Sequence, residues 1–167
     1  MTIDVRSLID PEERRATIPA LYDLRIRIFR DWPYLYEGTA DYEADYLAEF
    51  FREPGAVLVV AKDGDAIVGA ATASPMAAQK PEFQEPLRRH GLDVARIFYF
   101  GESVLLPAFQ GQGIGHRFFD AREAAARAAG AVQTAFCAVI RPEDHPMRPE
   151  APRDLHPFWR ARGYTPV

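Results

Sequence analysis

Three glycines stand at alternate positions in the segment QGQGIG, residues 110–115, and no other stretch constrains the fold as much. An apolar run before it predicts a strand over 96–106, and an alanine-rich stretch predicts a helix over 113–129, with Gly130 as its C-terminal cap. Such glycines permit positive φ angles and let backbone N–H groups approach a ligand closely. Because the first amides of a helix have no intrahelical partner, the segment predicts an anion site.

Other interpretations of this segment were weighed against the anion site. One alternative is a turn that does nothing more than connect the strand to the helix. The dinucleotide-binding pattern GxGxxG is not matched, because His116 stands where the third glycine belongs and no strand–turn–helix unit opens the chain. A Walker A loop is not matched either, because no Gly-Lys-Ser/Thr follows. Neither nucleotide-binding motif therefore accounts for the segment.

The rest of the chain predicts a mixed sheet. Asp63-Gly64 favours a tight turn and hence an antiparallel hairpin. The helix over 113–129 connects two strands as a crossover, which places them parallel. The fold class is therefore α+β, a mixed α/β sheet with an antiparallel front. The other predicted elements are strands at 3–8, 56–62, 65–74 and 133–140, a strand from Tyr164, helices at 17–30, 41–52, 82–90 and 156–162, and a proline-rich loop at 141–157.

Composition predicts one globular domain over residues 1–167, since 48% of the residues are apolar and 26% are charged. A net charge of −4 argues against a nucleic-acid partner. No signal sequence or membrane span is seen, so a cytoplasmic location without a membrane partner is expected. No Cys/His cluster has metal-ligand spacing, and Cys137, in an apolar run, is expected to be buried. The chain ends soon after Tyr164, so a final strand is expected to be missing or supplied by a partner, which makes a homodimer worth testing.

The glycine segment resembles the acetyl-coenzyme A loop of the GCN5-related N-acetyltransferases, the GNAT superfamily. Gln110, Gly113 and Gly115 match the pattern Gln/Arg-x-x-Gly-x-Gly/Ala. SVLLPAFQGQGIG is similar to the family's strand end, PFWRARGY is similar to its Phe-Tyr-x-x-x-Gly-Phe ending, and the element order agrees over most of the chain. The resemblance implies a GNAT-like fold with splayed parallel strands, and transfer of an acetyl group from acetyl-CoA to a primary amine by direct attack.

The resemblance also implies a cofactor site. Backbone N–H groups from Gly111 to Gly115 would hold the pyrophosphate, and the strand end would pair with the pantetheine arm. A bulge at Gly101 would open the slot, and Arg117 would either reach a phosphate or remain solvated. Core-facing residues of the helix would be Ile114, Phe118, Ala121 and Ala125. The expected cofactor-binding residues are Val104, Leu105, Leu106, Gln110, Gly111, Gln112, Gly113, Ile114 and Gly115.

Glu102 is the candidate general base, a few residues before the cofactor loop, where several relatives place theirs. Strand alternation puts its side chain on one face with four apolar neighbours, Phe98, Phe100, Val104 and Leu106. An unpaired carboxylate in such surroundings has a raised pKa, which suits a base near neutral pH. The alternative is a carboxylate paired with an arginine such as Arg96 or Arg141, and a bulge in the strand could place the Glu102 side chain on the other face.

The general acid is where this chain departs from the family. Trp159 stands where the family's tyrosine is common, and an indole N–H is not a practical acid. His156 is the first candidate to replace it, followed by Tyr99 and His145. If none of them acts, the thiolate leaves unassisted. The missing tyrosine also favours a second hypothesis, a catalytically weak acyl-CoA-binding sensor or partner module.

Three aromatic residues, Trp32, Tyr34 and Tyr36, are the candidates for binding the acceptor. They cluster in DWPYLYEG beside Glu37, between the first two predicted helices, where the family commonly lines its acceptor pocket. Aromatic faces bind cationic amines, which predicts a small-molecule or peptide amine as acceptor. The alternative is that these rings close the hydrophobic core. The proline-rich loop is expected to form a rigid pocket wall.

Overall fold

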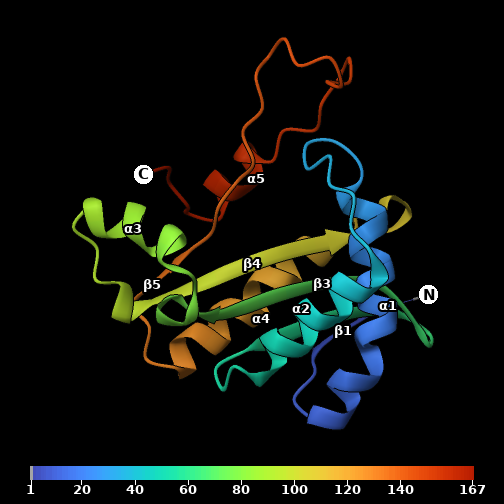
Figure 1. Cartoon of the computed structure of the whole chain (residues 1–167), viewed down its shortest axis with the longest axis horizontal. Coiled ribbons are helices and arrows are strands. Elements are labelled where there is room, and N and C mark those ends of the chain that lie inside the picture. The colour runs from blue at the N-terminus through green and yellow to red at the C-terminus, as the bar shows by residue number, and fades with distance from the viewer. Residues whose placement is uncertain (1) are drawn as a thin grey trace.

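The computed structural model describes residues 2–167 and shows a five-stranded sheet in the order β1-β2-β3-β4-β5 (Figure 1). The strands from β1 to β4 are antiparallel, and β4 and β5 are parallel, which confirms the mixed sheet. The elements are β1 (Asp4–Ser7), α1 (Pro11–Phe29), α2 (Ala40–Arg52), β2 (Val57–Asp63), β3 (Ala66–Pro75), α3 (Pro81–Arg89), β4 (Ile97–Leu105), α4 (Ile114–Ala128), β5 (Gln133–Ala135) and α5 (His156–Ala161).

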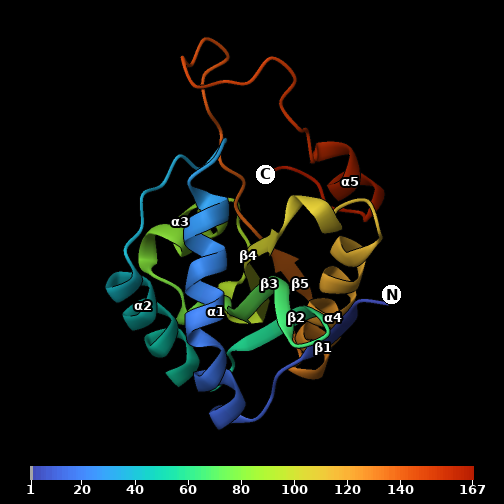
Figure 2. The ribbon, with the colours of Figure 1, turned by 90° about the vertical axis from the view of Figure 1, so that its right-hand side faces the viewer.

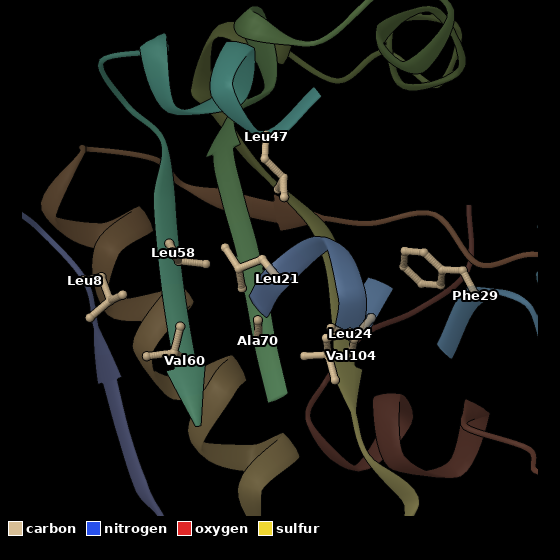
Figure 3. Close-up of a cluster of buried hydrophobic side chains, with 9 residues drawn as sticks. All are labelled: Leu8, Leu21, Leu24, Phe29, Leu47, Leu58, Val60, Ala70 and Val104. Carbon is tan, nitrogen blue, oxygen red and sulfur yellow. The ribbon is translucent and has the colours of Figure 1, made fainter. Parts of the chain in front are cut away.

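Helices cover both faces of the sheet. Figure 2 shows α1 and α2 on one side of it and α4 on the other. On the first side, Leu21 and Leu24 of α1 pack with Leu47 of α2 against apolar residues of β2, β3 and β4 (Figure 3). On the other side, Ile114 and Phe118 of α4 are buried against the sheet, as predicted. None of the helices within residues 2–167 combines the length and apolar character needed to cross a membrane.

The first helix is longer than predicted. It begins at Pro11 rather than at residue 17, because Asp10 caps it: the Asp10 carboxylate accepts a hydrogen bond of 2.8 Å from the Glu13 amide. Pro11 occupies the first turn, where its missing N–H costs no hydrogen bond. The predicted hairpin, with Gly64 at a φ of 60°, and the predicted helices α2, α3 and α4 are confirmed within a few residues.

A bulge interrupts the pairing of β3 with β4. Ala71 pairs with Ser103 and Ala73 with Phe100, so Gly101 and Glu102 both lie opposite Thr72. A Cβ atom at Gly101 would lie 2.5 Å from the Thr72 hydroxyl oxygen, so glycine is required at this point. The bulge predicted at Gly101 is therefore confirmed.

The strand predicted over 133–140 is wrong in length. β5 pairs with Ile97–Tyr99 of β4 and ends at Ala135, after which β4 passes its bulge and the two strands separate. The apolar run that follows has no strand beside it within the described residues, so Ile140 is 89% exposed. Cys137 is exposed for the same reason, and its predicted burial is wrong.

The C-terminal residues correct a further expectation. Residues 164–167, all described by the structure, do not form the strand predicted from Tyr164. Instead, the Tyr164 hydroxyl bonds to Thr134 at 2.9 Å and to Glu123 at 3.0 Å. This side chain therefore holds the segment after α5 against α4 and β5.

Candidate functional site

The glycine turn leaves the first amides of α4 accessible. Gly111 and Gly113 adopt positive φ angles of 76° and 78°, and Gly113 is the N-cap of α4. In the described part of the chain, no side chain caps this helix, and beyond the adjacent residues no heavy atom lies within 4 Å of a Cβ built on either glycine. Gly115 differs, because a Cβ there would contact the Phe158 ring of α5 at 3.5 Å. Two glycines thus form an open cradle suited to a phosphate group, and the third lies against α5.

Beside this turn, one edge of β4 is open. The Leu106 amide donates to the Val68 carbonyl of β3 at 2.9 Å, and Val104 pairs with Ala70. Because ladder bonds alternate along an antiparallel pair, Ser103 and Leu105 direct their N–H and C=O groups to the opposite edge. That edge faces the region that β5 leaves when it ends at Ala135.

Of the three strand residues expected to bind the pantetheine arm, Leu105 therefore presents its main chain outward, together with Ser103, which sequence analysis missed. Two glutamines brace the turn that follows. The side-chain amide of Gln110 donates to the Leu105 carbonyl, and the side-chain amide of Gln112 donates to the Ala108 carbonyl, each at 3.4 Å. Arg117 donates to the carbonyl of Ile3, the residue before β1, at 2.9 Å, so this side chain is engaged there rather than free to reach a phosphate.

The bulge changes the face of the sheet on which Glu102 lies. Phe98 and Phe100 face α4, and the ring of Phe100 lies 5.7 Å from that of Phe119. Glu102 instead faces α1, where Val104 packs in the cluster of Figure 3. The prediction that Glu102 shares a face with Val104 is confirmed, and the prediction that it shares one with Phe98 and Phe100 is wrong. The extra residue in the strand shifts the alternation of side chains by one position.

An arginine that sequence analysis missed pairs with Glu102. Arg25 of α1 forms ion pairs with both Glu102 and Glu43 of α2, so neither Arg96 nor Arg141 is the partner of Glu102. Glu43 is completely buried and accepts a further hydrogen bond of 3.1 Å from the Tyr36 hydroxyl. Two carboxylates and one guanidinium leave this cluster with a net charge of −1.

A cavity of about 280 Å³ is lined by two members of this cluster, Arg25 and Glu43, and Glu102 lies behind Arg25, outside the lining. Its walls are mostly aromatic, and the Arg25 guanidinium lies 4.7 Å from the centre of the Tyr46 ring. Burial raises the pKa of Tyr34, Tyr36 and Tyr46, so these phenols are protonated at neutral pH. The lining residues are Arg25, Phe29, Tyr34, Tyr36, Tyr42, Glu43 and Tyr46.

The structure places the three predicted acceptor residues differently. Tyr34 and Tyr36 line the cavity, whereas the Trp32 ring lies 5.3 Å from that of His145 in the proline-rich loop. Arg141 connects the same two loops, because it donates to the carbonyls of Pro33 and Tyr34 at 2.8 and 2.7 Å. Figures 1 and 2 both show these loops side by side at one end of the molecule. The proline-rich loop, residues 141–157, therefore supports the segment DWPYLYEG, residues 31–38, which we call the aromatic loop.

The two candidate acids lie apart. Tyr99 is buried beside the Phe83 ring of α3. The pKa of its phenol is raised mainly by burial and, to a lesser extent, by the neighbouring Cys137 thiol. His156 lies exposed at the start of α5, 2.7 Å from an Asp154 carboxylate oxygen and with its ring 5.2 Å from that of Trp159. Both candidates line a larger cavity of about 810 Å³ along β5.

Comparison with known proteins identifies the family of the chain. The model of the acetyltransferase (GNAT) family matches residues 18–150, and the chain therefore belongs to that family. No curated protein matches the chain.

Solved structures share the fold. The aminoglycoside N-acetyltransferase AAC(6')-Iy in complex with CoA is 16% identical, with a TM-score of 0.69 over 99% of this chain and 90% of that one. The same enzyme with a CoA-based bisubstrate analogue is 16% identical, with a TM-score of 0.68 over 99% and 92%. The aminoglycoside antibiotic 6'-N-acetyltransferase AAC(6')-Ih from Acinetobacter baumannii is 13% identical, with a TM-score of 0.67 over 99% and 92%.

Proposed function

We propose that the protein is an acetyl-CoA-dependent N-acetyltransferase that acetylates a primary amine of a small cationic molecule. The observation that carries this proposal is the continuity of the open β4 edge with the glycine turn. Ser103 and Leu105 offer main-chain groups that suit the amides of a pantetheine arm. The first turn of α4, beyond Gly113, then offers amides and a helix dipole that suit a diphosphate.

The reaction needs a base on the acceptor side. A neutral amine nitrogen attacks the thioester carbonyl, a C–N bond forms, and the C–S bond breaks to release CoA as a thiolate. We assign Glu102 the role of accepting the proton of the amine, directly or through water. We assign Tyr99 the return of a proton to the thiolate, because burial keeps this phenol protonated at neutral pH and it shares the Glu102 side of the sheet. His156, on α5, is the other candidate.

The acceptor cavity favours a cation. Its walls are mostly aromatic, and aromatic faces attract ammonium groups. Its two charged lining residues, Arg25 and Glu43, offset each other, so the preference for a cation rests on the aromatic walls. Two structurally similar proteins are aminoglycoside N-acetyltransferases, which supports a small molecule that bears amino groups.

Two observations favour the second candidate, an acyl-CoA-binding module with little turnover. Arg25 already pairs with Glu102, which opposes the uptake of a proton by this carboxylate. Trp159, which packs on Phe136 at 5.1 Å between ring centres, offers no proton to a thiolate. Binding of acyl-CoA is common to both candidates, and turnover separates them.

The test begins with thermal denaturation in the presence of acetyl-CoA, longer acyl-CoAs, ATP and NAD. Acetyl-CoA is expected to protect the protein and ATP and NAD are not; protection by ATP or NAD alone would contradict the proposal. CoA release is then measured across monoamines, diamines, amino acids and an aminoglycoside. Because an exposed thiol at Cys137 would add to the signal of a thiol reagent, the assay uses Cys137→Ser. Release that rises with the charge of the amine supports the enzyme, and protection without release supports the binding module.

A further inference from the structure

Arg122 is a buried cation without a carboxylate partner in the described part of the chain. It lies in the middle of α4 on the side that faces the sheet and is 1% exposed. Its guanidinium carbon lies 4.4 Å from the centre of the Phe100 ring and 4.8 Å from that of the Phe119 ring. Burial lowers the pKa of Arg122 to about 10, which reflects the free-energy cost of burying this charge. Other interactions must therefore compensate for that cost.

Those interactions are concentrated at the bulge. Nη1 of Arg122 donates to the carbonyls of Thr72 and Glu102 at 3.2 and 3.4 Å, and Nη2 donates to the Ser103 hydroxyl at 2.8 Å. A bulge breaks the ladder between two strands and leaves carbonyl groups without their usual partners. Arg122 thus supplies donors to both strands where β3 and β4 fail to bond to each other.

We propose that Arg122 is a positioning residue, which holds the bulge in the shape that turns Glu102 toward Arg25 and leaves the main chain of Ser103 at the open edge. The inference rests on the proposed function, since it assigns Glu102 and this edge to catalysis and cofactor binding. A guanidinium fits the task because it presents several N–H groups in a rigid plane, whereas the ammonium of a lysine is a single point charge.

The test compares Arg122→Lys with Arg127→Lys, a matched change on the same helix whose side chain is 75% exposed. Both are assayed well below their unfolding temperatures, and kcat is expressed per active enzyme after titration with labelled CoA. Arg122→Lys is expected to raise KM for acetyl-CoA about tenfold and to lower kcat about 10- to 100-fold, because small misplacements of reacting groups are costly. Arg127→Lys is expected to stay within about twofold of wild type.

A purely structural role predicts a different result. A variant that is merely less stable has a smaller active fraction, and its KM and its kcat per active enzyme match those of the control. That outcome would overturn the inference. If Arg122→Lys does not fold, Ser103→Ala replaces it, since this change removes one acceptor of Arg122 and leaves the buried cation in place. It is expected to raise KM for acetyl-CoA about threefold, and an unchanged KM would contradict the proposal.

Hydrogen exchange keeps this test separate from the proposed function. The Glu102 amide donates to the Thr72 hydroxyl at 3.2 Å across the bulge. In ligand-free protein, Arg122→Lys is expected to speed exchange of the Glu102 amide at least tenfold relative to Arg127→Lys, with the Phe98 amide unchanged. If wild-type protein neither binds nor consumes acetyl-CoA, the proposed function fails, and hydrogen exchange alone decides the inference about Arg122. Equal exchange of the Glu102 amide in Arg122→Lys and Arg127→Lys would overturn that inference.

Discussion

The two halves of the proposed site present different chemical groups. The cofactor half, from Ser103 to Gly115, offers main-chain N–H and C=O groups on one continuous segment. The acceptor half offers side chains, and its central ion pair joins Arg25 to Glu102 across 77 residues of sequence. A short motif therefore identifies the first half, while the second exists only after α1, α2 and β4 have packed together. Substitutions that change one half and leave the other intact test this division.

Glu102→Gln is expected to have the largest effect, and on turnover only. The change removes the proposed base, so kcat should fall about 10²- to 10⁴-fold. KM for acetyl-CoA should stay the same, because the main chain of the cofactor half is unchanged. Steady-state kinetics beside Glu49→Gln, an exposed change on α2, provide the control. If Glu102→Gln kept the kcat of that control, the assignment of the base would be wrong.

Gly113→Asp is expected to act on the cofactor half alone. It adds a side chain at a φ of 78° and a negative charge at the start of α4, so the Kd of acetyl-CoA should rise at least about 100-fold. Gly130→Asp is a matched control, because Gly130 has the same φ of 78° but lies beyond the other end of the helix. Calorimetric titration of both variants distinguishes loss of the anion site from backbone strain. Equal affinities would refute the diphosphate site.

Glu43→Ala is expected to reduce stability on the acceptor half. It leaves Arg25, whose side chain is 11% exposed, with one carboxylate in place of two, which should cost about 3 kcal/mol of the free energy of unfolding. The control is Glu85→Ala, which breaks an exposed pair with Arg89 at 3.1 Å and should cost about 0.3 kcal/mol. Urea denaturation measures both. A similar loss in the two variants would show that the buried cluster contributes no more to stability than a surface ion pair.

The Tyr164 side chain holds the segment after α5 against α4 and β5. Unfolding of Tyr164→Phe at several pH values tests how much this side chain contributes to the free energy of unfolding. Burial, and then the Glu123 carboxylate, raises the pKa of Tyr164 to about 12. Its stabilising contribution is therefore complete below the unfolded pKa of about 10 and is lost as the pH rises toward 12.

Because Tyr164 is only partly buried, solvent screening reduces this pH-dependent contribution to about 1 kcal/mol between pH 9 and 11. The stability of Tyr164→Phe, measured by urea denaturation, should fall less over that range than the stability of wild type. Tyr42→Phe, at an exposed ring, is expected to keep the wild-type slope. Parallel slopes for wild type and Tyr164→Phe would exclude this contribution.

Local signals accounted for most of the elements. The turn at Gly64, the caps of α4 and the glycine segment depend on neighbours in sequence, and the structure has each of them where it was predicted. The early start of α1 was also readable, because Asp10, Pro11 and Glu13 form a helix N-terminal signature. The end of β5 was missed, because the apolar run after Ala135 continues the local strand signal beyond the point where the two strands separate.

The side-chain partners were harder to predict. The face on which Glu102 lies follows from the bulge, and its partner Arg25 comes from α1, 77 residues earlier in the chain. One kind of signal was overlooked twice. Arg25 falls four residues after Leu21 and four before Phe29, so a cation interrupts the buried face of α1. Arg122 falls four residues after Phe118 and four before Ala126, so a cation interrupts the apolar stripe of α4.

The two tryptophans of the chain lie in two segments outside the sheet, the aromatic loop and α5. Trp32 packs against His145 of the proline-rich loop, and Trp159 packs against Phe136. Replacing either by phenylalanine leaves a single intrinsic fluorophore. Emission spectra of the two variants then monitor the aromatic loop and α5 separately, without an added dye.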